Sequence, residues 1–148
     1  IKSIDSSCQF GISPAGNLYN DYNILYADVY KWCSNSVYID YICPQIYWGF
    51  EHSSAPYATI LKNWANIVTS NTVDLYVGLA AYKSGTIDSG NREWIDQNDV
   101  LKRQVESGRQ YDAYGGFILY RYDSLFRPSS DVKSCVEAER DNLSAILS

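Results

Sequence analysis

The fold is decided by the stretch Ile42-Cys43-Pro44-Gln45-Ile46-Tyr47-Trp48-Gly49-Phe50. Just upstream, Val37, Tyr38, Ile39 and Tyr41 form a β-branched and aromatic run, which is typical of a strand covered on both faces. From Gln45 onward an amide, two large aromatic residues and a glycine crowd together. In α/β folds, ligands bind where strands end and loops begin. The stretch therefore predicts a strand with a binding site at its carboxyl end.

Four segments with a strand pattern occur along the chain, and a helical pattern follows each of them. Strands are expected at about 9–13, 38–47, 75–81 and 116–120. Apolar residues recur at helical spacing over 57–68, 100–111 and 132–147, and a short helix is expected within 25–33. The strands start at intervals of roughly 30 to 40 residues, which fits a strand, a crossover helix and a return. We therefore expect a parallel sheet built from four βα units.

Composition predicts one globular unit over residues 1–148. Hydrophobic residues make up 46% of the chain and charged residues 20%, and no linker rich in Pro, Gly or Ser divides it. The formal charge of -5, with scattered Lys and Arg, provides no basic stripe for nucleic acid. No apolar run approaches a membrane span. Two architectures fit: a small flavodoxin-like α/β sheet, or half of a (β/α)8 barrel, which typically needs about 250 residues.

The residue pattern does not favour metal or cofactor chemistry. Cys8, Cys33, Cys43 and Cys135 show no paired C-x-x-C spacing and are expected to be free, buried thiols. His52 is the only histidine, which excludes a histidine-rich metal site, and the glycines form no phosphate-binding motif. The chain is instead rich in tyrosine, with 14 residues. A tyrosine ring combines an apolar face with a hydroxyl group, which suits sugar rings, although packing in and around the core explains many of them equally well.

Motifs at the four strand ends carry a resemblance to a known family. The most specific is Ile39-Asp40-Tyr41-Ile42 followed by Pro44-Gln45-Ile46-Tyr47-Trp48. The others are Phe10-Gly11-Ile12-Ser13-Pro14 with Tyr26-Ala27-Asp28 and Lys31-Trp32, Leu75-Tyr76-Val77-Gly78 with Ala80-Ala81-Tyr82-Lys83, and Gly116-Phe117-Ile118 with Tyr120. Together they resemble the last four βα units of the bacterial glycosyl hydrolase-like 10 family, which is built on a TIM barrel. The resemblance implies an α/β half-barrel containing strands 5 to 8 with their helices.

The resemblance also implies a function. The parent protein is expected to be a glycosidase acting on a glycan or polysaccharide, and this chain is expected to contribute the strand 5 to 8 side of its carbohydrate-binding cleft. The family's Asp-rich run at the end of the fourth strand would precede Ile1, so this half alone is expected to be inactive. Members are often exported, which favours an exported or cell-envelope location in a bacterium. The alternative is a non-catalytic carbohydrate-binding or scaffold α/β module.

Glu51 is the candidate catalytic residue. Hydrolysis of a glycosidic bond ordinarily requires two carboxyl groups that flank the bond. Most acidic residues of this chain lie in expected helices or at strand starts, whereas Glu51 and Asp123 closely follow strand ends. Partial burial of Glu51 between Phe50 and His52 would raise its pKa toward that of a general acid. A solvated loop glutamate is the alternative interpretation.

The residues expected to bind substrate share a position at or just after a strand end: Gln45, Tyr47, Trp48, His52, Tyr82, Lys83 and Tyr120. An amide can hold sugar hydroxyls, a tyrosine can stack or donate, and a lysine can meet a negative charge. Because side chains alternate along a strand, Gln45 and Tyr47 should share one face and Ile46 and Trp48 the other. Filling of the barrel and packing at its rim are the structural alternatives.

A half-barrel also predicts self-association. Four parallel strands leave two unpaired edges and an apolar inner face, which is an association hazard. We expect two copies of the chain to approximate a closed barrel.

Overall fold

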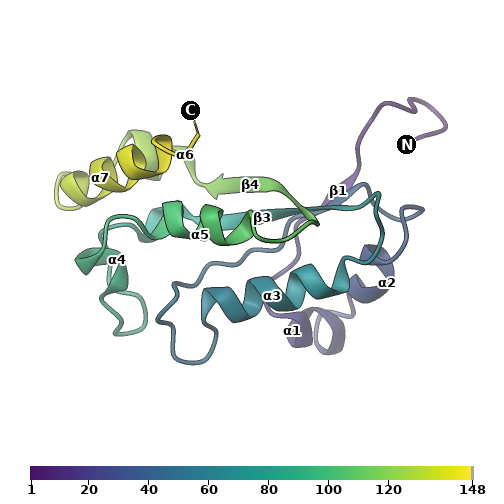
Figure 1. Cartoon of the computed structure of the whole chain (residues 1–148), viewed down its shortest axis with the longest axis horizontal. Helices are drawn as coiled ribbons and strands as arrows, with labels where there is room; N and C mark the ends of the chain where they lie inside the picture. The colour runs from purple at the N-terminus through teal and green to yellow at the C-terminus, as the bar shows by residue number, and fades with distance from the viewer. Residues whose placement is uncertain (148) are drawn as a thin grey trace.

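A computed structural model describes residues 1–147 as four consecutive βα units around a parallel sheet (Figure 1). The strands are β1 (Gly11–Ile12), β2 (Tyr41–Ile42), β3 (Asp74–Ala80) and β4 (Tyr114–Tyr120). The helices are α1 (Leu18–Asn23), α2 (Val29–Cys33), α3 (Tyr57–Ile67), α4 (Glu93–Asp96), α5 (Val100–Gly108), α6 (Tyr122–Phe126) and α7 (Lys133–Ser144), with a 3-10 turn, η1, at Ala81–Lys83. No helix in this range has the length and apolar character that crossing a membrane requires.

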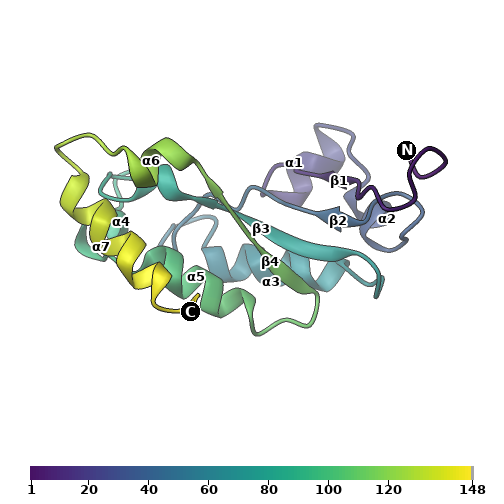
Figure 2. The ribbon, with the colours of Figure 1, turned by 90° about the horizontal axis from the view of Figure 1, so that it is seen from above.

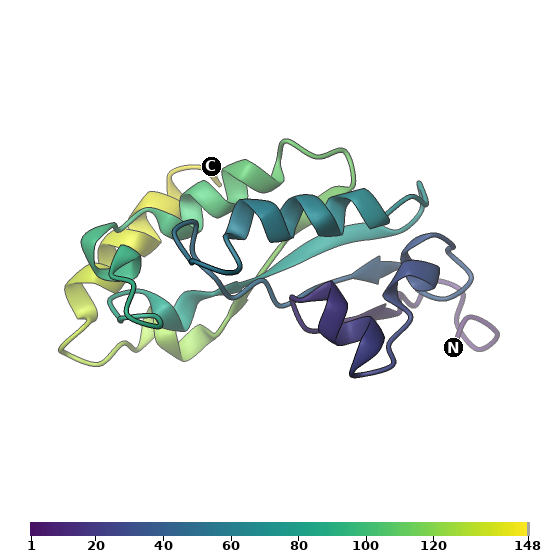
Figure 3. The same cartoon turned by 90° about the horizontal axis from the view of Figure 1, so that it is seen from below.

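The strands follow one another across the sheet in chain order, β1-β2-β3-β4, and every neighbouring pair is parallel. A flavodoxin-like sheet would instead place its second strand at the edge and carry helices on both faces. Here α3 and α5 lie side by side along one face of β3 and β4 (Figures 1 and 3). Sequential parallel strands with helices on one side are the arrangement of half a (β/α)8 barrel, as the sequence predicts.

The core fills the space between the sheet and its helices. Ile42, Leu75 and Val77 point from the strands into this layer and are fully buried, as are Leu61 and Trp64 of α3. The opposite face of the sheet, seen in Figure 2, carries no helix within residues 1–147. The sequence pattern predicted strands that are covered on both faces, but in this chain helices cover only one face. The uncovered face is the one that would point into a barrel.

Strand β2 is much shorter than the predicted segment 38–47. Pro44 has no backbone N–H and interrupts the ladder after Ile42. Pairing resumes at isolated bridges, where the Gln45 N–H donates to the Pro14 carbonyl at 3.0 Å and the Ile46 N–H donates to the Gly78 carbonyl at 3.1 Å. The chain thus stays in the sheet through Ile46 without regular strand geometry.

Other expectations also needed correction. The first unit contains α1 in addition to the expected short helix; Asn17 caps α1 by accepting a hydrogen bond from the Asn20 N–H at 3.1 Å. All four cysteines are free, as expected, but only Cys33 and Cys43 are buried. Cys8 is exposed because the N-terminal segment lies outside the core.

Candidate functional site

The uncovered face of the sheet contains a hollow of about 520 Å³. Its walls come from all four strands or the residues just after them: Gly11, Ile12, Ser13, Tyr41, Cys43, Gln45, Tyr47, Gly78, Ile118 and Tyr120. Gly78 is part of its wall, and a Cβ at that position would lie 3.0 Å from the Pro44 carbonyl oxygen and 3.5 Å from the Tyr47 ring, so the glycine allows the segment after β2 to approach closely. The volume of the hollow is within the range of small-ligand pockets.

Three tyrosine rings from three different βα units meet at one side of this hollow. The rings of Tyr47 and Tyr82 lie edge to face with centroids 5.9 Å apart. Tyr120 stacks on Tyr47 at 6.0 Å and meets Tyr82 edge to face at 6.2 Å. We call Tyr47, Tyr82 and Tyr120 the tyrosine cluster. Tyr47 and Tyr82 come after the carboxyl ends of β2 and β3, and Tyr120 is the last residue of β4, so all three lie at the edge where parallel α/β sheets bind ligands.

Burial sets the protonation state of the groups around the hollow. It raises the pKa of the Tyr47 phenol, as do the neighbouring Cys43, Tyr82 and Tyr120 groups. It also raises the pKa of Tyr82, and nearby Asp88 adds to this effect. Both phenols therefore keep their protons at neutral pH and can donate hydrogen bonds. Burial raises the pKa of the Cys43 thiol to about 11, so Cys43 is not a ready nucleophile.

Gln45 is exposed at the floor of the hollow. Its Nε2 atom lies 3.5 Å from both the carbonyl oxygen and the hydroxyl of Ser13, at the outer limit of a hydrogen bond. The amide thus remains available to a ligand. Ile46, the next residue, is fully buried in the core on the other side. Gln45 and Tyr47 share one face, in agreement with the alternation of side chains along the segment.

Lys83 follows Tyr82 but its charge is already paired. Its Nζ donates to Oδ2 of Asp88 at 2.6 Å, and both side chains are largely buried. This pair occupies the loop after β3 and holds Asp88 close enough to affect Tyr82. Lys83 therefore borders the tyrosine cluster as half of an ion pair.

The structure places Trp48, His52 and Glu51 away from the hollow. The rings of Trp48 and His52 lie 6.1 Å apart, and the His52 Nδ1 atom accepts a hydrogen bond from the Ala55 N–H at 3.1 Å. Glu51 is exposed, and its Oε1 accepts from Nε2 of Gln97 at 2.9 Å. The partial burial expected for Glu51 is therefore wrong, because its side chain points outward from the loop.

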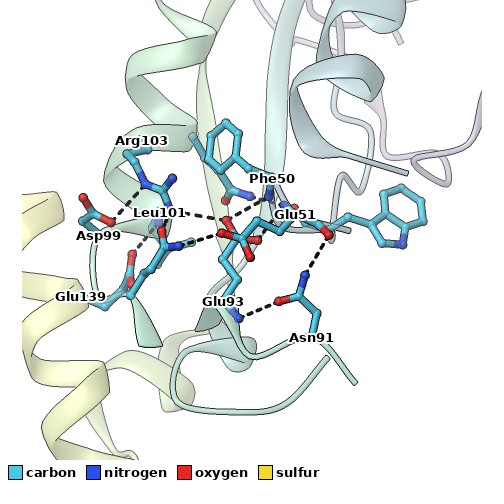
Figure 4. Close-up of polar contacts among 11 residues, drawn as sticks. Phe50, Glu51, Asn91, Glu93, Asp99, Leu101, Arg103 and Glu139 are labelled. Atoms are coloured by element: carbon cyan, nitrogen blue, oxygen red, sulfur yellow. Dashed lines mark hydrogen bonds and ion pairs between the residues drawn. The ribbon is translucent and has the colours of Figure 1, made fainter. Parts of the chain in front are cut away.

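Glu93 holds the loop from Trp48 to Glu51 in place through hydrogen bonds, and sequence reasoning missed this residue (Figure 4). The N–H groups of Phe50 and Glu51 donate to its two carboxylate oxygens at 3.1 and 3.0 Å. Arg103 approaches the same carboxylate at 3.4 Å. Glu93 is only 2% exposed. This buried carboxylate therefore serves as the acceptor that holds the loop at the sheet edge.

Two neighbours complete this arrangement. Nδ2 of Asn91 donates to the Glu51 carbonyl at 2.8 Å, while its Oδ1 accepts from the Glu93 N–H at 2.7 Å. A side chain at Gly49 would collide with the Glu93 carboxylate, so the glycine is required by close approach. A glycine between two aromatic residues was the one sequence signal that could have indicated a packed loop here.

No carboxylate lines the hollow itself. Nor do any three His, Cys, Asp or Glu side chains among residues 1–147 gather as a metal site would require. What the hollow offers is neutral: an amide, phenol hydroxyls and aromatic faces. Amide and phenol groups can exchange hydrogen bonds with a hydroxylated ligand.

Comparison with known proteins relates the chain to proteins named glycosyl hydrolases. A family model described as Glycosyl hydrolase-like 10 matches residues 1–96. The chain is 36% identical over 146 residues to Glycosyl hydrolase DigH of Escherichia coli K12, covering 88% of this chain and 33% of that protein. It is 30% identical over 154 residues to Glycosyl hydrolase YngK of Bacillus subtilis 168, covering 94% of this chain and 29% of that protein. The chain thus spans about a third of the length of these curated relatives.

Proposed function

Because the chain belongs to the glycosyl hydrolase-like 10 family, we propose that it forms the strand 5 to 8 side of the carbohydrate-binding cleft of a glycosidase. The whole protein would cleave a glycosidic bond in a glycan or polysaccharide. The single observation that supports this assignment best is the tyrosine cluster beside the exposed amide of Gln45. Sugar rings present apolar faces to aromatic rings and hydroxyl groups to amides and phenols.

Four of the seven proposed binding residues, Gln45, Tyr47, Tyr82 and Tyr120, take direct roles in this proposal. Gln45 holds a pair of sugar hydroxyls through its donor and acceptor atoms, and the protonated phenols of Tyr47 and Tyr82 donate to others. Lys83 acts through its ion pair with Asp88, which orders the loop that carries Tyr82. Trp48 and His52 lie outside the hollow and would contact only a substrate that extends beyond it.

This half alone should bind without cleaving. Glycosidases use two carboxyl groups, separated by about 5 to 10 Å, on either side of the scissile bond. The hollow has none in its lining. Glu51 is the carboxyl group of this chain that we propose for catalysis in the whole protein, because it lies in the loop after β2 at the ligand-binding edge. A move of its side chain from Gln97 toward the substrate would be required.

The chain should also self-associate through the uncovered face. Ile118 and Tyr120 are about half exposed on β4, at 50% and 51%, and both line the hollow. Tyr41 and Tyr76, whose rings meet at 5.5 Å, extend the same apolar surface. Two copies joined through their unpaired edge strands, β1 and β4, would enclose these side chains and approximate a closed barrel.

Calorimetric titration with a panel of neutral oligosaccharides tests the proposal. The chain should bind at least one member with a dissociation constant in the micromolar to millimolar range, and a reducing-sugar assay should detect no cleavage. Gln45→Ala should weaken binding, whereas Gln110→Ala, at an exposed glutamine after α5, should not. Failure of every oligosaccharide to bind, or cleavage by this chain alone, would contradict the proposal. A non-catalytic module would bind equally well, and absence of hydrolysis by the whole protein would identify it.

A further inference from the structure

A second hollow of about 500 Å³ lies on the helical side of the molecule, between α3 and the pair α1 and α2. Its lining consists of Gly16, Asn17, Leu18, Tyr19, Asn23, Tyr30, Ile60, Asn63, Asn66 and Ile67. We call this hollow the asparagine groove. Figure 3 shows α1 and α3 on neighbouring parts of this side of the molecule. Both walls come from this chain, and none of the lining residues belongs to the tyrosine cluster.

The groove combines amides with aromatic and aliphatic side chains and carries no charge. Four of its ten lining residues are asparagines and two are tyrosines, and none is acidic or basic. A lining without cations gives no attraction to phosphate or carboxylate groups, and a lining without anions gives none to basic peptides. The chemistry of the groove therefore matches a neutral ligand with many hydroxyl groups.

Two of the asparagine amides are free to meet a ligand. Asn17 uses its side-chain oxygen to cap α1, and Nδ2 of Asn23 donates to the Tyr19 carbonyl at 3.1 Å. Asn63 and Asn66 are exposed on α3 and line the groove, and their side chains make no hydrogen bond within residues 1–147. Each amide offers two donors and one acceptor, which can engage adjacent hydroxyls of a sugar in pairs.

Two tyrosine rings supply flat surfaces beside these amides. Tyr19 of α1 is 66% exposed and Tyr30 of α2 is 43% exposed. The Tyr30 ring is oriented by Tyr22, which meets it edge to face at 5.4 Å. Aromatic rings bind the apolar faces of sugars, and they lose little conformational entropy because they have few rotatable bonds.

The walls of the groove are held in place without a ligand. Nε1 of the fully buried Trp64 donates to the Gly16 carbonyl at 2.8 Å, which joins α3 to the turn before α1. Oδ1 of the buried Asp21 accepts from the Ala15 N–H at 3.0 Å, which fixes α1 to the same turn. A ligand that enters the groove therefore has little protein to order, which favours binding.

From these features we infer that the asparagine groove is a second carbohydrate site, which binds a neutral oligosaccharide on the outer, helical surface. Its volume lies within the range of about 300–1,000 Å³ for small-ligand sites. The site lies outside the proposed cleft, and its binding does not depend on that cleft. It would keep the protein on a polymeric glycan while the cleft engages one segment of it.

Heteronuclear NMR of the isotope-labelled chain tests this inference residue by residue. Neutral tetrasaccharides of glucose, N-acetylglucosamine and xylose serve as probes. At least one should shift the side-chain amide signals of Asn63 and Asn66 in a saturable manner. The N63A/N66A double variant and Tyr19→Ala should each weaken this binding by about tenfold or more, since each removes direct contacts. Alanine is a good helix former, so α3 should remain folded.

Two controls make the result decisive. Lys62→Ala, on the same helix but outside the groove lining, should bind as the unmodified chain does. Gln45→Ala should retain the shifts at Asn63 and Asn66, which separates this site from the cleft. The inference is overturned if none of the probes moves these signals at millimolar concentration, including the case in which only another protein binds there. It is also overturned if the double variant binds unchanged.

Discussion

The rings of Tyr47 and Tyr82 lie edge to face, with centroids 5.9 Å apart, although the two residues belong to different βα units. Their contact requires the chain leaving β2 and the chain leaving β3 to converge at one edge of the sheet. Tyr120, the last residue of β4, completes the contact from a third unit. An aromatic surface built from three strand ends is a property of the parallel sheet and not of any one loop.

Removal of one member of the tyrosine cluster should weaken carbohydrate binding. Tyr82→Ala removes a ring that contacts both Tyr47 and Tyr120, and we expect about three- to tenfold weaker binding by calorimetry. Tyr38→Ala is the matched control, because Tyr38 is 39% exposed and Tyr82 is 42% exposed, but Tyr38 precedes β2 at the opposite end of the sheet. Equal losses in both variants would contradict a binding role for the cluster.

Glu93 should contribute strongly to stability. Glu93→Ala leaves the N–H groups of Phe50 and Glu51 without their acceptor and removes the ion-pair partner of Arg103. Unsatisfied buried donors cost about 1–3 kcal/mol, so the free energy of unfolding should fall by at least that amount in urea denaturation.

The control for this change is Glu106→Ala, an i,i+4 partner of Lys102 at the surface of α5. Exposed pairs of this kind contribute about 0.5 kcal/mol or less. The loop should also become more sensitive to limited proteolysis between Trp48 and Ala55 in the Glu93 variant. A Glu93→Ala protein as stable as the Glu106→Ala protein would refute the assigned role.

Glu139 on α7 should make stability depend on pH. Burial raises its pKa to about 7 from an ordinary 4.5; the Leu101 and Val100 N–H groups oppose this shift, as does Arg103, whereas Asp99 adds to it. Below pH 4.5 Glu139 holds its proton in both the folded and the unfolded chain, so its burial does not lower the free energy of unfolding there. As pH rises toward 7 and above, the unfolded chain releases the proton first. Stability should therefore fall by an amount on the order of 2 kcal/mol between pH 5 and pH 8.

Glu139→Gln isolates this contribution because glutamine keeps an acceptor for the Leu101 N–H, which donates to Glu139 at 2.5 Å. The stability of Glu139→Gln relative to the unmodified chain should rise between pH 5 and pH 8 in urea denaturation. Glu137→Gln, at a half-exposed neighbour on α7, should show no such trend. Parallel pH profiles for Glu139→Gln and the unmodified chain would rule out a raised pKa at this position.

Sedimentation velocity should detect self-association of the chain. The unmodified chain should form dimers as its concentration rises, because the uncovered sheet face is apolar. Ile118→Lys places a charge at a half-exposed position on that face and should return the chain to a monomer. Ile87→Lys, at a similarly exposed residue in the loop after η1, is the control. A monomer at high concentration, or equal effects of both variants, would contradict association through this face.

The order of the elements could be predicted because it rests on local patterns. The strand-helix alternation follows from apolar periodicity, and β3 at Asp74–Ala80 lies within one residue of its predicted bounds. The shared face of Gln45 and Tyr47 follows from the two-residue period of an extended chain. The shortness of β2 could also have been read from the sequence, since Pro44 cannot donate to a ladder.

The path of the loop after β2 could not be predicted in the same way. Glu51 and Trp48 were assigned to the cleft from their distance along the chain, but side-chain direction in a loop depends on tertiary partners. The partner here is Glu93, which lies 42 residues from Glu51 and has no local pattern that marks it. Lys83 was expected to meet a negative charge of a ligand, and in the structure Asp88 of its own loop pairs with it. The tertiary contacts of the loops therefore set the side-chain directions that the strand pattern does not predict.

Intermolecular nuclear Overhauser effects between a bound oligosaccharide and the protein would locate the carbohydrate site itself. We expect contacts from sugar protons to the rings of Tyr47 and Tyr120 and to the Ile118 methyl groups, all on the uncovered face of the sheet. Contacts confined to Tyr19 and Tyr30 would support the asparagine groove but contradict the cleft. A saturating oligosaccharide that shows no contact with Tyr47, Tyr120 or Ile118 would show that this sheet face is not a carbohydrate site.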